Sequence, residues 1–229
     1  MDQLKTALIE HLSGCVTESR LTLFKRVLAE RTRYITILLE DIYQSQNASA
    51  VLRTCDCIGI QDVHIVEELN EYQVDRDVAL GSDQWLSLHY YRKGPDNIKL
   101  ATDSLKRAGY RIVATSPHCE GITPGNFNIE KGKVALMFGT ELNGLTDHAL
   151  ELADEYIQIP MVGFTESYNI SVSAAITLYS LRKRLEVSSL DWKIPGEERS
   201  ELLLKWLRTS IKKSDVIEKR FVENYKSDF

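Results

Sequence analysis

Between residues 34 and 185 the sequence alternates short apolar runs rich in β-forming residues with segments whose apolar residues recur at helical spacing. Strands separated by helices of this length predict a mostly parallel sheet with helices on both of its faces. The core is therefore expected to be an α/β domain. The expected strands are 34–39, 63–66, 86–90, 111–115, 134–138 and 156–159, and the expected helices are 48–58, 98–108, 146–153 and 170–185.

Helical spacing also marks both ends of the chain. Two helices are expected within residues 4–31, with a turn at Ser13–Gly14, and further helices follow a break at residues 191–196. Trp206 lies at helical spacing with apolar neighbours, which favours a packing face over a base-stacking platform. The sequence thus predicts an N-terminal helical extension (1–33), a central domain (34–186) and a C-terminal helical extension (187–229).

Charge is distributed unevenly along the chain, whose formal net charge is −5. Residues 34–181 hold 10 Lys+Arg and 20 Asp+Glu, whereas the two flanks together hold 18 and 13. An acidic core with basic flanks is expected where the flanks contact phosphates, although a merely solvated basic face has the same composition. The basic residues expected to contact nucleic acid are Arg20, Lys25, Arg26, Arg31 and Arg33.

No targeting or metal-binding pattern is recognisable. The N-terminus has the pattern of an amphipathic helix, and no apolar run approaches the roughly 18 residues of a membrane span. The four cysteines, at positions 15, 55, 57 and 119, form no CxxC pair, which predicts free thiols, a reducing compartment and hence the cytoplasm. Cys55 and Cys57 are expected to fill core space. His118 and Cys119 lack suitably spaced partners for zinc, so no metal is expected.

Ligands of parallel α/β sheets bind beyond the carboxyl ends of the strands, which directs attention to the loops after residues 39, 115, 138 and 159. The loop after Phe138 reads GTELNGLT. Its two glycines before a threonine suggest a phosphate-binding loop, but Leu145 stands where the lysine of such a loop is required. The dinucleotide fingerprint GxGxxG is also missing. Both observations argue against a nucleotide triphosphatase and against a Rossmann cofactor site.

Three segments together resemble a known family. FGTELNGL at 138–145 and IPMVGFTESYNISVSAA at 159–175 are similar to the second and third motifs of the TrmH/SpoU family of SPOUT RNA methyltransferases. The first motif is matched by Glu40 and Asp41 at a strand end and by NASAVLRT at 47–54. The three motifs occur in the family's order, each after an expected strand, and span about two-thirds of the chain.

This resemblance implies an α/β SPOUT fold with a C-terminal trefoil knot, although knots are otherwise nearly absent from proteins. It implies S-adenosylmethionine as the cofactor and transfer of its methyl group to a ribose 2′-hydroxyl of RNA, without a metal. SPOUT enzymes are typically homodimers, which implies a homodimer here. The implied cofactor contacts are Thr115, Gly139, Ile159, Met161 and Tyr168, and the implied catalytic residues are Arg53, Asn47, Glu141, Ser167 and Asn169.

The family's arginine, here Arg53, is implied to act with an RNA phosphate in activating the hydroxyl. A guanidinium stays protonated and is a poor base, so Arg53 is expected to hold the phosphate and hydroxyl while the proton leaves through phosphate or water. A charged residue on a helix that faces a sheet also needs a partner or a substrate. The other four have structural alternatives: Asn47 as a helix N-cap, Glu141 as a loop organiser, and Ser167 and Asn169 as caps of the long helix.

The substrate is implied by the same comparison. Gly81-Ser82-x-x-Trp85 and the helical tail are similar to enzymes that methylate the D-loop guanosine of tRNA. Two positions depart from the family pattern: Tyr168 replaces a usual leucine, and Gln46 replaces proline or histidine. The alternatives are a non-catalytic RNA-binding protein of the same fold, methylation of ribosomal RNA, and methylation of a base. In a homodimer, Arg53 is expected to serve the partner's cofactor.

Overall fold

The computed structural model describes residues 3–92, 94–118 and 121–227, with side chains up to residue 225. The chain separates into two compact units, Thr32–Trp192 and a unit made of Met1–Arg31 with Lys193–Phe229. The two terminal segments, which the sequence predicts as separate extensions, thus belong to one helical unit.

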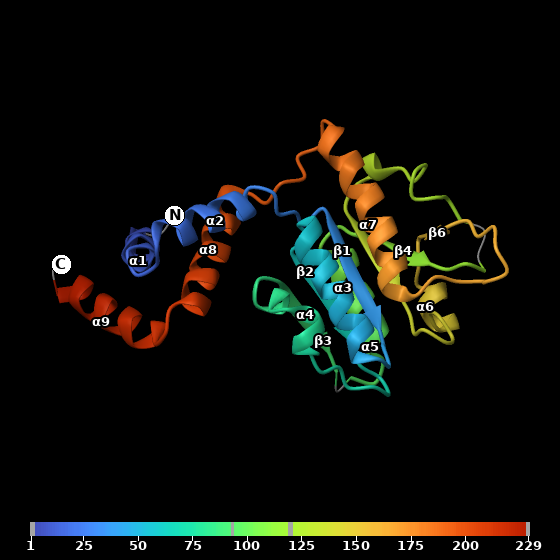
Figure 1. Cartoon of the computed structure of the whole chain (residues 1–229), viewed down its shortest axis with the longest axis horizontal. Helices are drawn as coiled ribbons and strands as arrows, with labels where there is room; N and C mark the ends of the chain where they lie inside the picture. Colours follow the sequence, from blue (N-terminus) through green and yellow to red (C-terminus); the bar gives the residue numbers. More distant parts are fainter. Residues whose placement is uncertain (1–2, 93, 119–120, 228–229) are drawn as a thin grey trace. The chain divides into compact units, whose positions relative to one another are not determined.

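Unit Thr32–Trp192 is built on a six-stranded sheet in the order β3-β2-β1-β5-β4-β6 (Figure 1). All five pairs of neighbouring strands are parallel, which confirms the α/β prediction. The strands are β1 (Ile35–Glu40), β2 (Asp62–Val66), β3 (Ser87–Tyr91), β4 (Arg111–Thr115), β5 (Val134–Phe138) and β6 (Glu155–Ile157). Strand β6 begins one residue earlier and ends two residues earlier than the sequence predicts.

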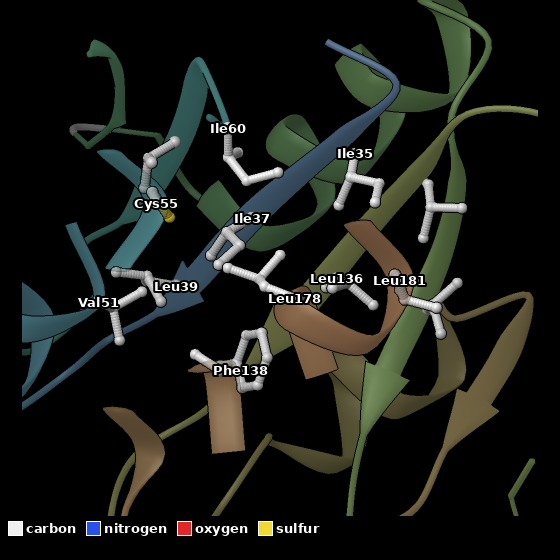
Figure 2. Close-up of a cluster of buried hydrophobic side chains, with 14 of the residues drawn as sticks. Ile35, Ile37, Leu39, Val51, Cys55, Ile60, Leu136, Phe138, Leu178 and Leu181 are labelled. Carbon is white, nitrogen blue, oxygen red and sulfur yellow. The ribbon is translucent and has the colours of Figure 1, made fainter. Parts of the chain in front are cut away.

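Helices cover both faces of this sheet. Residues of α3 and α7 share one buried cluster with the inward side chains of β1 and β5, as Figure 2 shows for Val51, Ile37, Phe138 and Leu178. Residues of α5 and α6 form a second cluster with the opposite side chains of the same strands. The helices of this unit are α3 (Ser45–Ile58), α4 (Arg76–Ala79), α5 (Asn97–Arg107), α6 (Asp147–Glu151) and α7 (Ile170–Val187), with short 3₁₀ turns η1 (Ser82–Gln84) and η2 (Ile129–Lys131).

Local signals explain where these helices begin and end. Gly59 ends α3 in the left-handed conformation at φ 86°, which glycine adopts without the steric cost of a Cβ atom. The Thr146 side chain accepts a hydrogen bond from the backbone N–H of Ala149 and so caps α6, as predicted. Successive side chains of β1 and β5 point to opposite faces of the sheet and so enter the two clusters in turn.

The helical unit contains α1 (Gln3–Ser13), α2 (Glu18–Leu28), α8 (Gly196–Ser210) and α9 (Ser214–Ser227). Trp206 on α8 is 1% exposed and meets the Phe24 ring edge-on, with the ring centroids 5.7 Å apart. This confirms that Trp206 belongs to a packing face. The His11 and Phe221 rings stack with centroids 4.6 Å apart, which joins α1 to α9.

The structure tests the expectations that Cys55 and Cys57 fill core space and that no segment spans a membrane. Cys55 is buried as expected, but Cys57 is exposed, because two residues on a helix turn the side chain about 200° around the axis. Cys119 lies outside the described residues. Among the helices that the structure describes, none is long and apolar enough to cross a membrane.

Candidate active site

Loops at the carboxyl edge of the sheet enclose a cavity of about 360 Å³. It is formed by the segments that follow β4, β5 and β6 and by the first turns of α7. This is the edge at which parallel α/β sheets bind ligands. The five residues expected to contact the cofactor all line it: Thr115, Gly139, Ile159, Met161 and Tyr168.

The cavity wall combines apolar side chains with irregular backbone. The Thr115 hydroxyl donates to the Met137 carbonyl oxygen at 2.7 Å, which fixes the end of β4 against β5. Ser116 and Pro117, which the sequence motifs did not indicate, also line the cavity. The carboxyl-edge rule applies to them as well, since they directly follow the strand that ends at Thr115.

The loop after β5 closes into a tight turn around Gly139. The Thr140 N–H donates to the Gly144 carbonyl at 2.9 Å, and the Gly144 N–H donates back to the Thr140 carbonyl at 3.0 Å. A Cβ atom on Gly139 would lie 2.1 Å from the carbonyl carbon and oxygen of Gly144 and 2.2 Å from the Leu145 nitrogen. Only glycine fits there, because the obstructing atoms are backbone.

A chain of polar side chains joins the three sequence motifs. The Asn47 amide donates to Glu141 Oε1 at 2.7 Å, and the Asn169 amide donates to Asn47 Oδ1 at 3.0 Å. Asn169 Oδ1 accepts from the Ser171 N–H at 2.9 Å and caps α7. The structure therefore places the first, second and third motifs in direct contact.

These contacts decide between the structural alternatives for each residue. Asn47 is not an N-cap, because Gln44 holds that position and Asn47 lies in the first turn of α3. Asn169 is the N-cap of α7, whereas Ser167 is not and instead lines the cavity. Glu141 also lines the cavity, so it both organises the loop and faces the ligand space.

A second link to the same loop was not anticipated. Glu40, 2% exposed at the end of β1, accepts hydrogen bonds from the Thr146 hydroxyl at 2.6 Å and from the Thr146 N–H at 2.9 Å. Burial raises the pKa of Glu40, an effect that its two hydrogen bonds oppose. The signal in the sequence was an acidic residue at the end of a buried strand, which needs a buried donor.

Arg53 does not occupy the place that its sequence context suggested. We expected it on the face of its helix toward the sheet, but it is exposed on α3, because its buried neighbours Val51, Leu52 and Cys55 take up that face. Within the described part of the chain, Arg53 is not among the residues that line the cavity. The geometry of one chain thus leaves its guanidinium facing solvent.

The five basic residues expected to contact RNA fall into different environments. Arg20, Lys25 and Arg26 are exposed on α2. The expectation that Arg31 contacts RNA is wrong, because this residue is 0% exposed. Its guanidinium lies 5.3 Å from the centre of the Trp206 ring, so it stabilises packing and is not accessible to RNA. Arg33 is partly buried, with its Nε 2.9 Å from a carboxylate oxygen of Asp62.

No group of three or more His, Cys, Asp or Glu side chains suited to a metal ion occurs within residues 3–92, 94–118 and 121–227. The cavity is lined by hydroxyl, amide, carboxylate and apolar groups together with glycine backbone. Such a lining suits an organic ligand with both apolar and hydrogen-bonding parts.

A parallel sheet whose carboxyl-edge loops enclose such a site defines the chain as an α/β protein that binds a small organic ligand. Sequence comparison identifies the family. Residues 34–179 match the SpoU rRNA Methylase family, and the chain belongs to it. It is 47% identical over 207 residues to the tRNA (guanosine(18)-2′-O)-methyltransferase of Borreliella burgdorferi, covering 90% of this chain and 93% of that protein.

Two further comparisons agree with this family. The protein of the same name from Thermus thermophilus is 34% identical over 194 residues, covering 84% of this chain and 97% of that protein. The crystal structure of the A. aeolicus TrmH/SpoU tRNA modifying enzyme is similar with a TM-score of 0.74 at 27% identity, covering 86% of this chain and 98% of that one. The similarity therefore extends beyond the catalytic domain into the flanking helices.

Proposed function

We propose that this protein transfers a methyl group from S-adenosylmethionine to the ribose 2′-hydroxyl of the D-loop guanosine of tRNA, the guanosine-18 position. The observation that carries the proposal is the direct contact of Asn47, Glu141 and Asn169, which assembles all three family motifs beside one cavity. The relatives named above support the choice of tRNA and of this nucleotide, since two of them bear that activity in their names.

The cavity fits the cofactor on structural grounds. Its volume of about 360 Å³ is within the range for small-molecule sites, and Ile159, Met161 and Tyr168 supply apolar surface for an adenine ring. Gly139 lets the loop after β5 fold back on itself beside the cavity, because any side chain there would collide with Gly144. When bound there, S-adenosylmethionine supplies a methyl group activated on a sulfonium.

The protein's own residues then align the acceptor and assist loss of its proton. Alignment of reacting groups alone can supply about 7–11 kcal/mol of a barrier. Asn47 and Glu141 hold the ribose beside the cavity. Glu141 accepts the Asn47 amide through Oε1, so its other carboxylate oxygen can accept a hydrogen bond from a ribose hydroxyl. Arg53 binds the RNA phosphate and stabilises the negative charge that develops on the 2′-oxygen, and the proton leaves through phosphate or water.

Assembly as a homodimer belongs to the same proposal. Val172, Ile176 and Tyr179 on α7 are 43%, 37% and 60% exposed and recur at helical spacing, so they form an uncovered apolar stripe. Arg53 lies outside the cavity lining of its own chain. Both observations support a dimer in which Arg53 reaches the partner's cavity.

Mixing two defective variants at a cofactor concentration below the wild-type Kd tests this arrangement. Arg53→Ala lacks the phosphate-binding group, and Gly139→Ala is expected to bind S-adenosylmethionine at least about tenfold more weakly. If Arg53 acts across the dimer, dimers reassembled from a one-to-one mixture should regain about a quarter of wild-type activity, because half are mixed and each mixed dimer has one complete site. Failure to regain activity in mixtures that form mixed dimers would assign Arg53 to its own chain.

We also propose that the carboxyl-edge loops form the trefoil knot of SPOUT proteins. The pairing of Ile122 with Ile157, which are far apart in sequence, supports this.

The proposal also includes RNA contact by the helical unit and a cytoplasmic location. Exposed Lys25 and Arg26 on α2 support contact of the helical unit with tRNA phosphates. A tRNA substrate and the free thiols of Cys15 and Cys57 support a cytoplasmic location.

Mass mapping of methylated nucleosides tests the reaction. Unmodified bulk tRNA and ribosomal RNA are incubated separately with the protein and labelled S-adenosylmethionine, and the tRNA should acquire 2′-O-methylguanosine in its D-loop fragment. Label on a base, or on ribosomal RNA alone, would overturn the assignment of the acceptor. Absence of cofactor binding by calorimetry at millimolar concentration would instead favour a non-catalytic RNA-binding protein.

A further inference from the structure

Tyr43 is an exposed aromatic residue in the short segment between β1 and α3. Its side chain is 74% exposed, whereas its neighbour Ile42 is only 6% exposed and packs into the core. An isolated exposed tyrosine is ordinary on a protein surface. Tyr43 differs from such a residue because the segment that carries it is tightly held and adjoins the active site.

The segment is held by Asp41. Its Oδ1 accepts hydrogen bonds from the backbone N–H groups of Glu68, Leu69 and Asn70 at 3.0, 2.9 and 2.8 Å. Asp41 itself has a φ of 51°, an uncommon conformation for a residue other than glycine. The chain therefore leaves β1 through a fixed turn, and Tyr43 is presented by ordered backbone on both of its sides.

On its other side Tyr43 adjoins the polar chain of the active site. Gln44 Oε1 accepts from the Asn47 amide at 3.0 Å, and the same amide nitrogen donates to Glu141. Leu142, the residue after Glu141, is 91% exposed. The polar chain from Gln44 to Glu141 is thus flanked at each end by an exposed apolar side chain.

We propose that Tyr43 stacks on the base of the target nucleotide, with Leu142 as a second apolar contact, while its ribose lies along Asn47 and Glu141. This inference rests on the proposed function. If the target nucleotide turns out of the RNA stack to bring its hydroxyl into the cavity, its base loses the stacking of its neighbours. An aromatic ring restores that contact through the π-face of the purine.

The proposal predicts a defined kinetic effect. Replacing an aromatic side chain that stacks on a base by alanine commonly lowers affinity by about 5- to 150-fold. Tyr43→Ala should therefore lower kcat/KM for tRNA within that range, while Tyr43→Phe, which keeps the ring, should stay near wild type. The Kd of S-adenosylmethionine should not change in either variant. Leu100→Ala is a matched control, because Leu100 is 49% exposed on α5, across the sheet.

Removal of the base separates stacking from a merely structural effect. Binding of wild-type and Tyr43→Ala protein is compared on tRNA with guanosine at the target position and on tRNA with an abasic ribose there. Tyr43→Ala should weaken binding only to the tRNA that carries the base. Equal weakening on both RNAs, or none on either, overturns the inference. If wild-type protein methylates no tRNA, the proposed function itself fails; wild-type methylation with an unaffected Tyr43→Ala variant rejects the stacking role alone.

Discussion

At the scale of single residues, His64 shows how a buried titratable group responds to its surroundings. It lies on β2 with its ring stacked on His89 at 4.6 Å and its Nδ1 3.0 Å from the Tyr91 hydroxyl. Burial, with a smaller contribution from the nearby His89, lowers the pKa of His64 to about 4. His64 is therefore neutral in the folded protein at pH values where an unfolded histidine is already protonated.

This difference predicts acid sensitivity. In the unfolded state His64 binds a proton below about pH 6.5, whereas in the folded state it does so only near pH 4. The contribution of His64 to the free energy of unfolding is therefore fully present above pH 6.5 and is lost as the pH falls toward 4. Between pH 7.5 and 5, His64 should cost about 2 kcal/mol of unfolding free energy. Urea unfolding of wild type and His64→Gln at both pH values measures it. An equal loss in both proteins would exclude His64 as the source.

Single residues also show where sequence reasoning stops. The family motifs identified Asn47, Glu141 and Asn169, but only the fold shows that they bond to one another, because 94 and 122 residues separate Asn47 from its partners. Burial was harder to foresee. Helical spacing alone did not reveal that Arg31 is buried against Trp206 or that Arg53 is exposed.

At the scale of elements, the loop after β5 depends on glycine at one position. Gly139→Ala should lower affinity for S-adenosylmethionine by at least about tenfold, because the added methyl group meets immobile backbone and overpacking typically costs about 1–3 kcal/mol. Calorimetry measures the affinity. Gly125→Ala is the matched control, since nothing lies within 4 Å of a Cβ atom there. Similar affinities in both variants would show that the loop adjusts.

Strands and helices were predictable where the period of the apolar pattern was clear. Buried β1 and β5 read as continuous apolar runs because both of their faces are covered, as Figure 2 illustrates for one face. The strand order was not predictable. Placement of β5 between β1 and β4 depends on packing of α3, α5 and α7 against the sheet, which no local pattern encodes.

At the scale of the whole molecule, charge divides the protein into an acidic catalytic unit and basic flanks. Exchange of Lys25 and Arg26 for glutamate should weaken tRNA binding and reduce the steepness of its dependence on salt by roughly 1.5–2 in log–log slope, because two phosphate contacts are lost. The pair Lys99→Glu with Arg107→Glu changes the net charge equally on exposed positions of α5. If both double variants bind alike, net charge alone governs affinity, and α2 is not a tRNA-binding surface.

The discontinuity of the helical unit has a consequence for biosynthesis. Helix α1 contacts α8 and α9, helix α2 contacts α8, and the apolar residues Leu8, Leu12, Phe24 and Leu28 of the first two helices are buried. Residues 32–192 are nevertheless synthesised between these two pairs of helices. At roughly 5–20 residues per second, ribosomes need on the order of 8–30 s to add that stretch. During this interval the first two helices have emerged without their partners. We therefore expect the apolar faces of the first two helices to stay uncovered, and available to chaperones, until the C-terminal helices leave the ribosome.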